Sequence, residues 1–204
     1  MSQFIATHKV IPQNQTISQT ISYSLLSALG WHIDVNLPNE KKFIVIGAPH
    51  TSNWDFVYFL LLMYSIRIKL HWIGKDSLFK WPVGSIMKRM GGIPVNRRSR
   101  NNFVNQIVES FQEYDELMIV ITPEGTRSKT PYWKTGFYYI AEGAQVPIAM
   151  GFIDYPHKHI GIDRSFLPSG DIQADFAIIR EFYADKKGKY PDEQGEIILK
   201  PREE

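Results

Sequence analysis

Phe43-Ile44-Val45-Ile46-Gly47-Ala48-Pro49-His50-Thr51-Ser52-Asn53-Trp54-Asp55 is an apolar run followed by a polar loop. The apolar part is short and rich in β-branched residues, which predicts a buried strand. The eleven residues after the loop, Phe56 to Ile66, are mostly Leu, Met and aromatic, which predicts a helix. A loop between a strand and a helix is held by two rigid elements, and functional residues are often placed on such loops.

His50 and Asp55 are five residues apart in this stretch. On one continuous helix that separation is about 500° of rotation, so the side chains would lie on different faces. They can meet only if His50 lies in the loop and Asp55 in the first helical turn, a start that Ser52 and Asn53 favour as N-cap residues. The helix dipole then favours an ionised Asp55. It can accept a hydrogen bond from one ring nitrogen of His50 and leave the other as a base.

The His-x4-Asp spacing occurs a second time, at His71 and Asp76. His71 falls within a predicted strand, 70–74, with no helix cap beside it, so we expect it to be structural. For His50 the local sequence leaves two interpretations open: a catalytic base, or a loop histidine beside a capped helix.

The 204 residues have an ordinary composition for one soluble globular domain, with 44% hydrophobic and 22% charged residues. The absence of cysteine excludes a disulfide framework and a thiol nucleophile. The N-terminus does not resemble a signal peptide, and no apolar run approaches the roughly 20 residues that span a bilayer. We therefore expect a cytoplasmic protein that is soluble or lies on a membrane surface.

Two segments suggest a surface partner. Residues 77–108 hold six basic residues and no acidic one, so this stretch is either a solvated face or a contact for phosphates. Residues 16–29 have apolar side chains at helical spacing, so this helix either packs on the domain or lies on a membrane.

Strand and helix patterns alternate along the rest of the chain. They predict a single α/β domain, 1–204, that is a layered fold with a largely parallel central sheet flanked by helices. Its parts are an N-terminal amphipathic helix at 16–30, a motif-bearing core at 42–153 and a charged tail at 186–204 that we expect to be frayed. Residues 158–162 and 164–167 are expected to form a hairpin or a sheet edge. The further predicted strands are 42–47, 93–97, 117–122 and 146–153, and the further helices are 81–90, 103–111, 134–144 and 171–185.

Three loops at strand ends are expected to meet, because loops at the carboxyl ends of parallel strands converge on one crevice. The first carries His50 and Asp55. The second, 91–97, carries a glycine pair that permits close approach of a ligand, and Arg97. The third, 123–127, carries Glu124, Gly125, Thr126 and Arg127. Arginines grip phosphate through paired hydrogen bonds, so a base beside them indicates group transfer involving a phosphate-bearing substrate.

Taken in order, His50-Thr-Ser-Asn-Trp-Asp55, Gly92-Ile-Pro-Val-Asn-Arg97 and Pro123-Glu-Gly-Thr-Arg127 resemble the first three sequence blocks of the glycerophospholipid (lysophosphatidic acid) acyltransferase family. Val146-Pro147-Ile148 resembles the fourth block, with Met150 where a second proline is common. The resemblance covers residues 43–152.

The resemblance implies a role for each matching residue. His50 would take the proton of a glycerol hydroxyl, with Asp55 orienting it, and the oxygen would attack the thioester of acyl-CoA or acyl carrier protein. Arg97 and Arg127 would hold the acceptor phosphate, Glu124 would position Arg127 or the loop, and Gly125 and Thr126 belong to the same binding loop. Backbone amides near Gly91-Gly92 are candidate oxyanion donors. No acyl-enzyme, cofactor or metal is implied.

The expected partners are an acyl thioester donor, a lysophospholipid-type acceptor such as 1-acyl-glycerol-3-phosphate, and the inner face of the membrane, bound peripherally. No nucleic acid is expected. Two alternatives stay open: an acyl-thioester hydrolase that uses the same base, and a non-catalytic module for anionic lipid or nucleic acid built on the basic stretch. His157 and His159 alternate on a predicted edge strand and are expected to face solvent rather than bind zinc.

Overall fold

The computed structural model describes residues 3–10, 16–95 and 100–201. Within these residues, nine strands form one sheet in the order β2-β3-β9-β8-β4-β7-β5-β6, and β1 pairs with β9. The strands are β1 (Gln3–Phe4), β2 (Thr7–Lys9), β3 (His32–Pro38), β4 (Lys42–Ala48), β5 (His71–Lys75), β6 (Gly92–Val95), β7 (Leu117–Ile121), β8 (Ile148–Asp154) and β9 (His159–Leu167).

The centre of the sheet is parallel. Strand β4 runs parallel to β7 and β8, and β5 runs parallel to β6 and β7. Antiparallel pairing occurs between β8 and β9, between β1 and β9, and between β2 and β3. The predicted α/β fold with a largely parallel central sheet is therefore confirmed.

Strand β4 shows why the run 43–46 is apolar throughout. Ile44 and Ile46 face one core cluster and Phe43 and Val45 face the other, and all four side chains are buried. A central strand covered on both faces has no position for a polar side chain.

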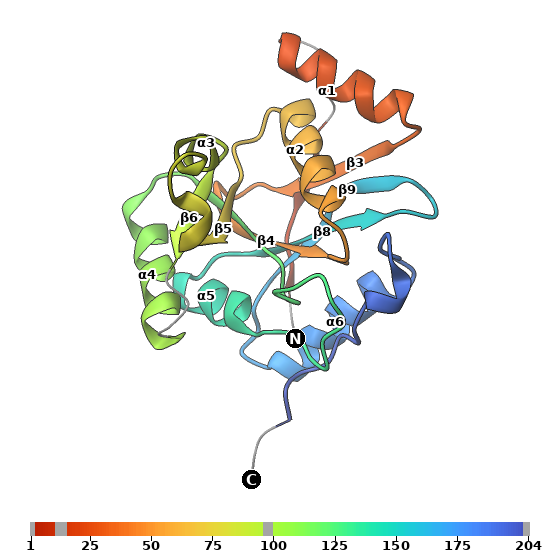
Figure 1. The fold of residues 1–204 in the computed structure, drawn as a ribbon. Coiled ribbons are helices and arrows are strands. Elements are labelled where there is room, and N and C mark those ends of the chain that lie inside the picture. The colour runs from red at the N-terminus through yellow and green to blue at the C-terminus, as the bar shows by residue number, and fades with distance from the viewer. Residues whose placement is uncertain (1–2, 11–15, 96–99, 202–204) are drawn as a thin grey trace.

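Helices cover both faces of the sheet, as Figure 1 shows. Leu26 of α1 and Leu62 of α2 pack with Phe43 and Val45. Residues of α4, α5 and α6 pack against Ile44 and Ile46 on the other face. The helices are α1 (Ile17–Ala28), α2 (Trp54–Ile66), α3 (Gly84–Arg89), α4 (Arg100–Glu113), α5 (Gly136–Ala144) and α6 (Ile172–Tyr183), and two short 3-10 helices are η1 (Asp76–Phe79) and η2 (Pro191–Glu193).

Helix α1 packs on α2 with an unusual orientation of its apolar stripe. Its buried residues are Gln19, Ser22 and Leu26, whereas Ile17 and Ile21 are exposed, together with Leu25 and Leu29. The helix therefore packs on the domain through Leu26 and presents an apolar stripe outward, and its contact with a membrane stays a prediction.

Strands β3 and β9 differ from the expectation. Sequence analysis assigned no strand to 32–38, although Ile33, Val35 and Leu37 alternate with polar residues there. Residues 159–167 form one strand rather than a hairpin or an edge, and it lies between β3 and β8. Arg164 has a φ of 50°, and the register with β8 shifts between Ala149 and Met150, so a bulge accommodates the irregular pattern.

The tail is also held more firmly than predicted. The Trp133 backbone N–H donates to the Ile198 carbonyl at 2.9 Å, and Ile197 and Leu199 pack against the core. Contacts of the apolar run 197–199 thus hold this mostly polar segment on the domain, so the expectation of a frayed tail was wrong for the described residues 186–201.

Candidate active site

His50 and Asp55 meet as the spacing predicts. His50 lies in the loop after β4, and Asp55 lies in the first turn of α2. The His50 Nδ1 atom is 3.1 Å from Asp55 Oδ2. The His50 side chain is 23% exposed and that of Asp55 is 8% exposed, so the carboxylate is shielded while the imidazole faces outward. With Nδ1–H donated to Asp55, Nε2 of His50 is the atom that can accept a proton.

The start of α2 is organised by Asp55 rather than by an N-cap side chain. Asn53 is the N-cap residue and makes no side-chain cap hydrogen bond. Instead, Asp55 Oδ2 accepts the backbone N–H groups of Thr51 and Ser52, both at 2.9 Å. The loop is thereby wrapped around the carboxylate, which holds the backbone of the His50 loop close to the helix.

Glu124 links the loop after β7 to the loop after β4. Its Oε2 accepts the His50 backbone N–H at 2.8 Å, and the residue is buried. The pKa of Glu124 is raised to about 8, chiefly by burial; the hydrogen bond from His50 opposes this rise, and the charge of Asp55 adds to it. Glu124 therefore holds the backbone of the His50 loop, which is one of the two positions in which it was expected to act.

Arg127 lies at the same edge of the sheet and donates a hydrogen bond from its guanidinium to the Asn53 side-chain carbonyl. The side chain is exposed, so its remaining donors face solvent. Thr126 is exposed beside it and accepts the Ser128 backbone N–H. Arg97, the other predicted phosphate ligand, lies outside the described residues.

Gly125 has a positive φ of 67°, which explains the choice of glycine in this turn. A β-carbon at this position would also overlap the Lys134 side chain. Gly125 therefore shapes the loop, and it contributes to the wall of the cavity described next.

An apolar cavity of about 680 Å³ extends from His50 between α2 and the sheet. Its polar end holds His50, Asn53, Thr126 and Arg127. Its inner wall is apolar because the strands present their α2-facing side chains there. The wall includes Val45, Phe56, Phe59, Leu62, Val120 and Ile153.

The Gly91-Gly92 pair does not belong to this site. Gly92 begins β6, which is three strands away from β4 in the sheet, and it pairs with Trp72 of β5 rather than with a residue of the His50 or Glu124 loop. A β-carbon on Gly91 would lie 2.6 Å from the Leu70 carbonyl oxygen, and one on Gly92 would lie 2.6 Å from the Phe79 ring. The glycines permit close packing of the chain, and the Gly91 N–H already donates to the Lys88 carbonyl at 3.0 Å, so this geometry gives no support to the suggested role of the pair as oxyanion donors.

The acyltransferase family model matches residues 30–150, which is more than half of the chain. The chain belongs to the acyltransferase family. The match spans the His50 loop, the Glu124 loop and most of the cavity wall, whereas Ile153 and the part of the wall formed by β9 lie beyond it. Comparison with curated proteins found no significant match.

This acyltransferase also resembles a solved structure, the crystal structure of the 1-acyl-sn-glycerophosphate (LPA) acyltransferase PlsC from Thermotoga maritima. The TM-score is 0.57 at 20% sequence identity, and the match covers 82% of this chain and 73% of that chain. At this identity the likeness supports the fold.

Sequence analysis missed the segments of the acyltransferase that reach the site from its C-terminal part. The Tyr155 hydroxyl donates to Asp55 Oδ1 at 2.6 Å, and the Tyr190 backbone N–H donates to Thr51 Oγ1 at 3.2 Å. Lys189 Nζ lies 5.2 Å from the centre of the Trp54 ring. One signal was available, because Tyr155 directly follows β8, a strand parallel to β4, and so lies at the same sheet edge as His50.

His71 is not part of the acyltransferase site. Trp72 lines the cavity, and its neighbour His71 points to the other side because successive side chains of a strand alternate. Burial lowers the pKa of His71, with the charge of Lys69 lowering it further. The side chain of Asp76 lies outside the described part of the chain.

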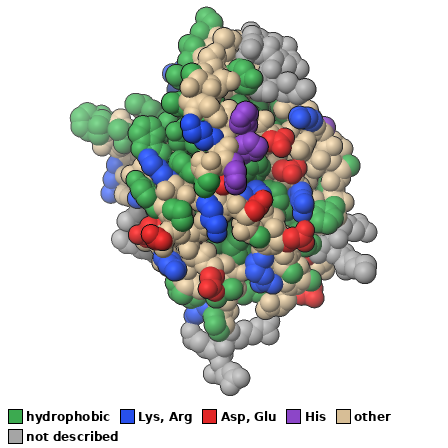
Figure 2. Space-filling view, turned by 90° about the vertical axis from the view of Figure 1, so that its right-hand side faces the viewer, with side chains coloured by type: hydrophobic (Ala, Val, Ile, Leu, Met, Phe, Trp, Pro, Cys, Tyr) green, Lys and Arg blue, Asp and Glu red, His purple; other side chains and the backbone are tan. Residues whose placement is uncertain are grey.

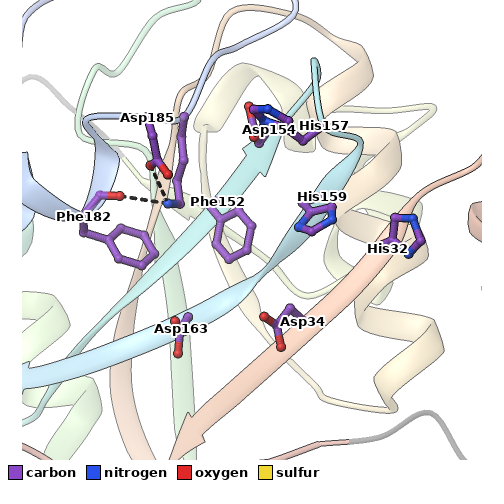
Figure 3. A pocket seen from close by; sticks show the side chains of 10 residues that line it. His32, Asp34, Phe152, Asp154, His157, His159, Asp163, Phe182 and Asp185 are labelled. Atoms are coloured by element: carbon purple, nitrogen blue, oxygen red, sulfur yellow. Dashed lines mark hydrogen bonds and ion pairs between the residues drawn. The ribbon is translucent and has the colours of Figure 1, made fainter.

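A second hollow of about 500 Å³ lies beside the C-terminal end of α6, against β3, β8 and β9. Figure 2 shows histidines gathered there among acidic and basic side chains, and Figure 3 shows His32 and His159 side by side on β3 and β9. His157, exposed as expected, bonds to Asp154. Among the described residues, no group of three or more His, Cys, Asp or Glu is placed to hold a metal ion.

Proposed function

We propose that this acyltransferase moves a fatty acyl group from acyl-CoA or acyl carrier protein to the free hydroxyl of a lysophospholipid-type acceptor, 1-acyl-glycerol-3-phosphate being the first choice. The observation that carries the proposal is His50, bonded to Asp55 through Nδ1 and placed at the polar end of an apolar cavity. Such a site brings a general base to the end of a long-chain thioester.

In the proposed step, His50 Nε2 takes the proton of the acceptor hydroxyl as the oxygen attacks the thioester carbonyl carbon. A C–O bond forms, the C–S bond breaks, and the thiolate leaves with the proton that the imidazolium returns. Asp55 stabilises the imidazolium in between, as the carboxylate does in a Ser-His-Asp triad. No cofactor or metal takes part in this proposal.

The acyl chain is proposed to occupy the apolar cavity. Its walls are formed by side chains of α2 on one side and of the sheet on the other, including Phe59, Leu62 and Val120. Its volume of about 680 Å³ is of the size that holds a small to medium ligand. Met150, which replaces the second proline of the fourth block, is fully buried in the cluster on the opposite sheet face and does not line the cavity.

The acceptor phosphate is proposed to bind at Arg127, beside Thr126. Arg127 is anchored on Asn53, next to the catalytic loop, and keeps exposed donors for a phosphate. Arg97 is proposed as a second ligand on its position after β6.

Peripheral binding to an anionic bilayer, on the inner face of the membrane, is proposed for the side of the molecule that carries α2. No helix within the described ranges is long and apolar enough to span a bilayer. The stripe of α1 and the η1–α3 lobe, residues 76–89, flank α2 on that side. Ile17 is 81% exposed and Trp81 is 93% exposed. Lys80, Lys88 and Arg89 in the same lobe are exposed as well and supply positive charge.

The decisive experiment measures thiol release from palmitoyl-CoA with and without 1-acyl-glycerol-3-phosphate, on the parent protein, His50→Ala and His71→Ala. Loss of a general base removes roughly 10²- to 10⁴-fold of the rate, so acceptor-dependent release should disappear in His50→Ala only. Because His71 belongs to the second His-x4-Asp match, it is the matched control.

The other outcomes are equally informative. Loss of thiol release only in His71→Ala would refute the site assignment. Thiol release at the same rate with and without the acceptor would indicate a hydrolase. No release from palmitoyl-CoA or palmitoyl carrier protein, with salt-dependent vesicle binding that His50→Ala leaves unchanged, would indicate a binding module.

A further inference from the structure

Both oxygens of the Asp55 carboxylate are occupied. Oδ2 accepts hydrogen bonds from the His50 ring and from the backbone N–H groups of Thr51 and Ser52. Oδ1 accepts the hydroxyl of Tyr155, at 2.6 Å, from a residue 100 positions further along the chain. The first three donors belong to the His50 loop itself, so Tyr155 supplies the bond that ties the carboxylate to the rest of the domain.

Tyr155 is itself held in place. Its ring makes edge contacts with Trp31, at 5.2 Å between ring centroids, and with Tyr58, at 5.9 Å. Its backbone N–H donates to the Lys187 carbonyl at 3.0 Å. A ring fixed from several sides keeps its hydroxyl directed at Asp55.

Tyr155 also stays in the donor state. Burial raises the pKa of Tyr155 far above its ordinary value, and the bond to Asp55 raises it further. A protonated phenol can only give its hydrogen to a carboxylate, so the direction of the hydrogen bond is fixed.

We propose that Tyr155 is a positioning residue for acyl transfer: its hydroxyl fixes the Asp55 carboxylate so that Oδ2 selects the His50 tautomer with a free Nε2. This proposal rests on the proposed function. Rotation of a carboxylate about its last side-chain bond is soft. Without the hydroxyl, Oδ1 loses its donor and only the Thr51 and Ser52 N–H groups still orient Oδ2. The bond that keeps the proton on Nδ1 of His50 is then less well fixed.

The test compares Tyr155→Phe with Tyr58→Phe. Both changes remove one hydroxyl from the same aromatic cluster, but among the described contacts the Tyr58 hydroxyl makes no hydrogen bond to Asp55. Hydrogen bonds to charged groups correspond to roughly 10- to 100-fold in an equilibrium or rate. We expect kcat to fall by that factor in Tyr155→Phe with KM within twofold of the parent, and both constants to stay parent-like in Tyr58→Phe.

Two further readouts separate positioning from a structural role. The ¹⁵N resonances of the His50 ring should show Nδ1 protonated in the parent and in Tyr58→Phe, and a mixture of tautomers in Tyr155→Phe. This readout needs no turnover, so it tests the inference even if the parent transfers no acyl group. In an Asp55→Asn background, Tyr155→Phe should lower kcat less than twofold, because the carboxylate through which Tyr155 acts is already gone.

A parent-like kcat in Tyr155→Phe would overturn the proposal. So would an equal loss in Tyr58→Phe, an unchanged His50 tautomer, or a loss in the Asp55→Asn background as large as in the parent. If Tyr155→Phe does not fold, Tyr155→His keeps a ring donor, and the same ¹⁵N comparison decides the question.

Discussion

Replacing Glu124 with glutamine should change how the stability of the protein depends on pH. Glutamine keeps the shape of the side chain and an oxygen that can accept the His50 N–H, but it cannot ionise. The parent carboxyl is buried, and its pKa is raised to about 8, chiefly by burial, from the ordinary glutamate value of 4.5. Between these two values the folded chain holds a proton on Glu124 that the unfolded chain has released.

The sign of the effect follows from this difference in bound protons. Where the folded state binds more protons, stability falls as pH rises, by about 1.4 kcal/mol per pH unit for one proton. The contribution of Glu124 is thus fully present below about pH 4.5 and is lost as pH rises through about 8. The free energy of unfolding of Glu124→Gln minus that of the parent should therefore rise by roughly 3 to 4 kcal/mol from pH 5 to pH 8 and then level off.

Urea unfolding of both proteins at half-unit steps from pH 5 to pH 9 measures this difference. Other titrating groups are shared and largely cancel in the subtraction. Glu109→Gln, which changes an exposed glutamate of α4, is the control. Its free energy of unfolding should depend on pH in the same way as that of the parent. A Glu124→Gln difference that stays flat across this range would show that the carboxyl titrates like an exposed one, and the account of its burial would be refuted.

Three further predictions concern α6, the cavity and the membrane surface. Asp171→Ala should lower the free energy of unfolding by about 1 kcal/mol in urea titration, because Asp171 accepts the N–H groups of Gln173 and Ala174 at the start of α6; an unchanged midpoint would contradict this. Gly47→Ala should shift activity from long towards shorter acyl chains. Its β-carbon would fit at an ordinary 3.6 Å from Val120 and would take up space in the cavity. Equal rates with all chain lengths would refute the proposal that the acyl chain occupies this cavity. Ile21→Lys or Trp81→Ala should weaken flotation with anionic vesicles while thiol release from a soluble short-chain substrate stays parent-like, because both side chains are exposed on the side that carries α2; flotation equal to the parent in both variants would place membrane contact elsewhere.

The sequence was sufficient where a structure depends on neighbours along the chain. The run 43–46, the loop and the helix that begins at Trp54 followed from apolar pattern and spacing, and so did the meeting of His50 and Asp55. The last helix was predicted at 171–185 for the same reason, and its first residue, Asp171, is the N-cap of α6. In each case the partners are separated by a few residues, so backbone geometry alone brings them together.

The sequence was less informative where chemistry and packing give the same pattern. Gly91 and Gly92 looked like a ligand-binding pair, but they lie at the start of β6, three strands away from β4 and its His50 loop. The short strand β3 alternates polar and apolar residues and was still missed. The charged tail was expected to fray, because the short apolar run Ile197-Ile198-Leu199 carries little signal in a mostly charged sequence.

Only the tertiary structure decided which distant residues support His50. Glu124 lies 74 residues from His50, yet its side chain accepts the His50 backbone N–H. Tyr155 lies 100 residues from Asp55, yet its hydroxyl donates to the Asp55 carboxylate. The order of strands brings them there, since β4 pairs with both β7 and β8 and the loops that follow these strands end at one edge. Local sequence determined that this chain could place a base beside a carboxylate, whereas strand pairing, which is stabilised by burial across the whole sheet, determined what surrounds them.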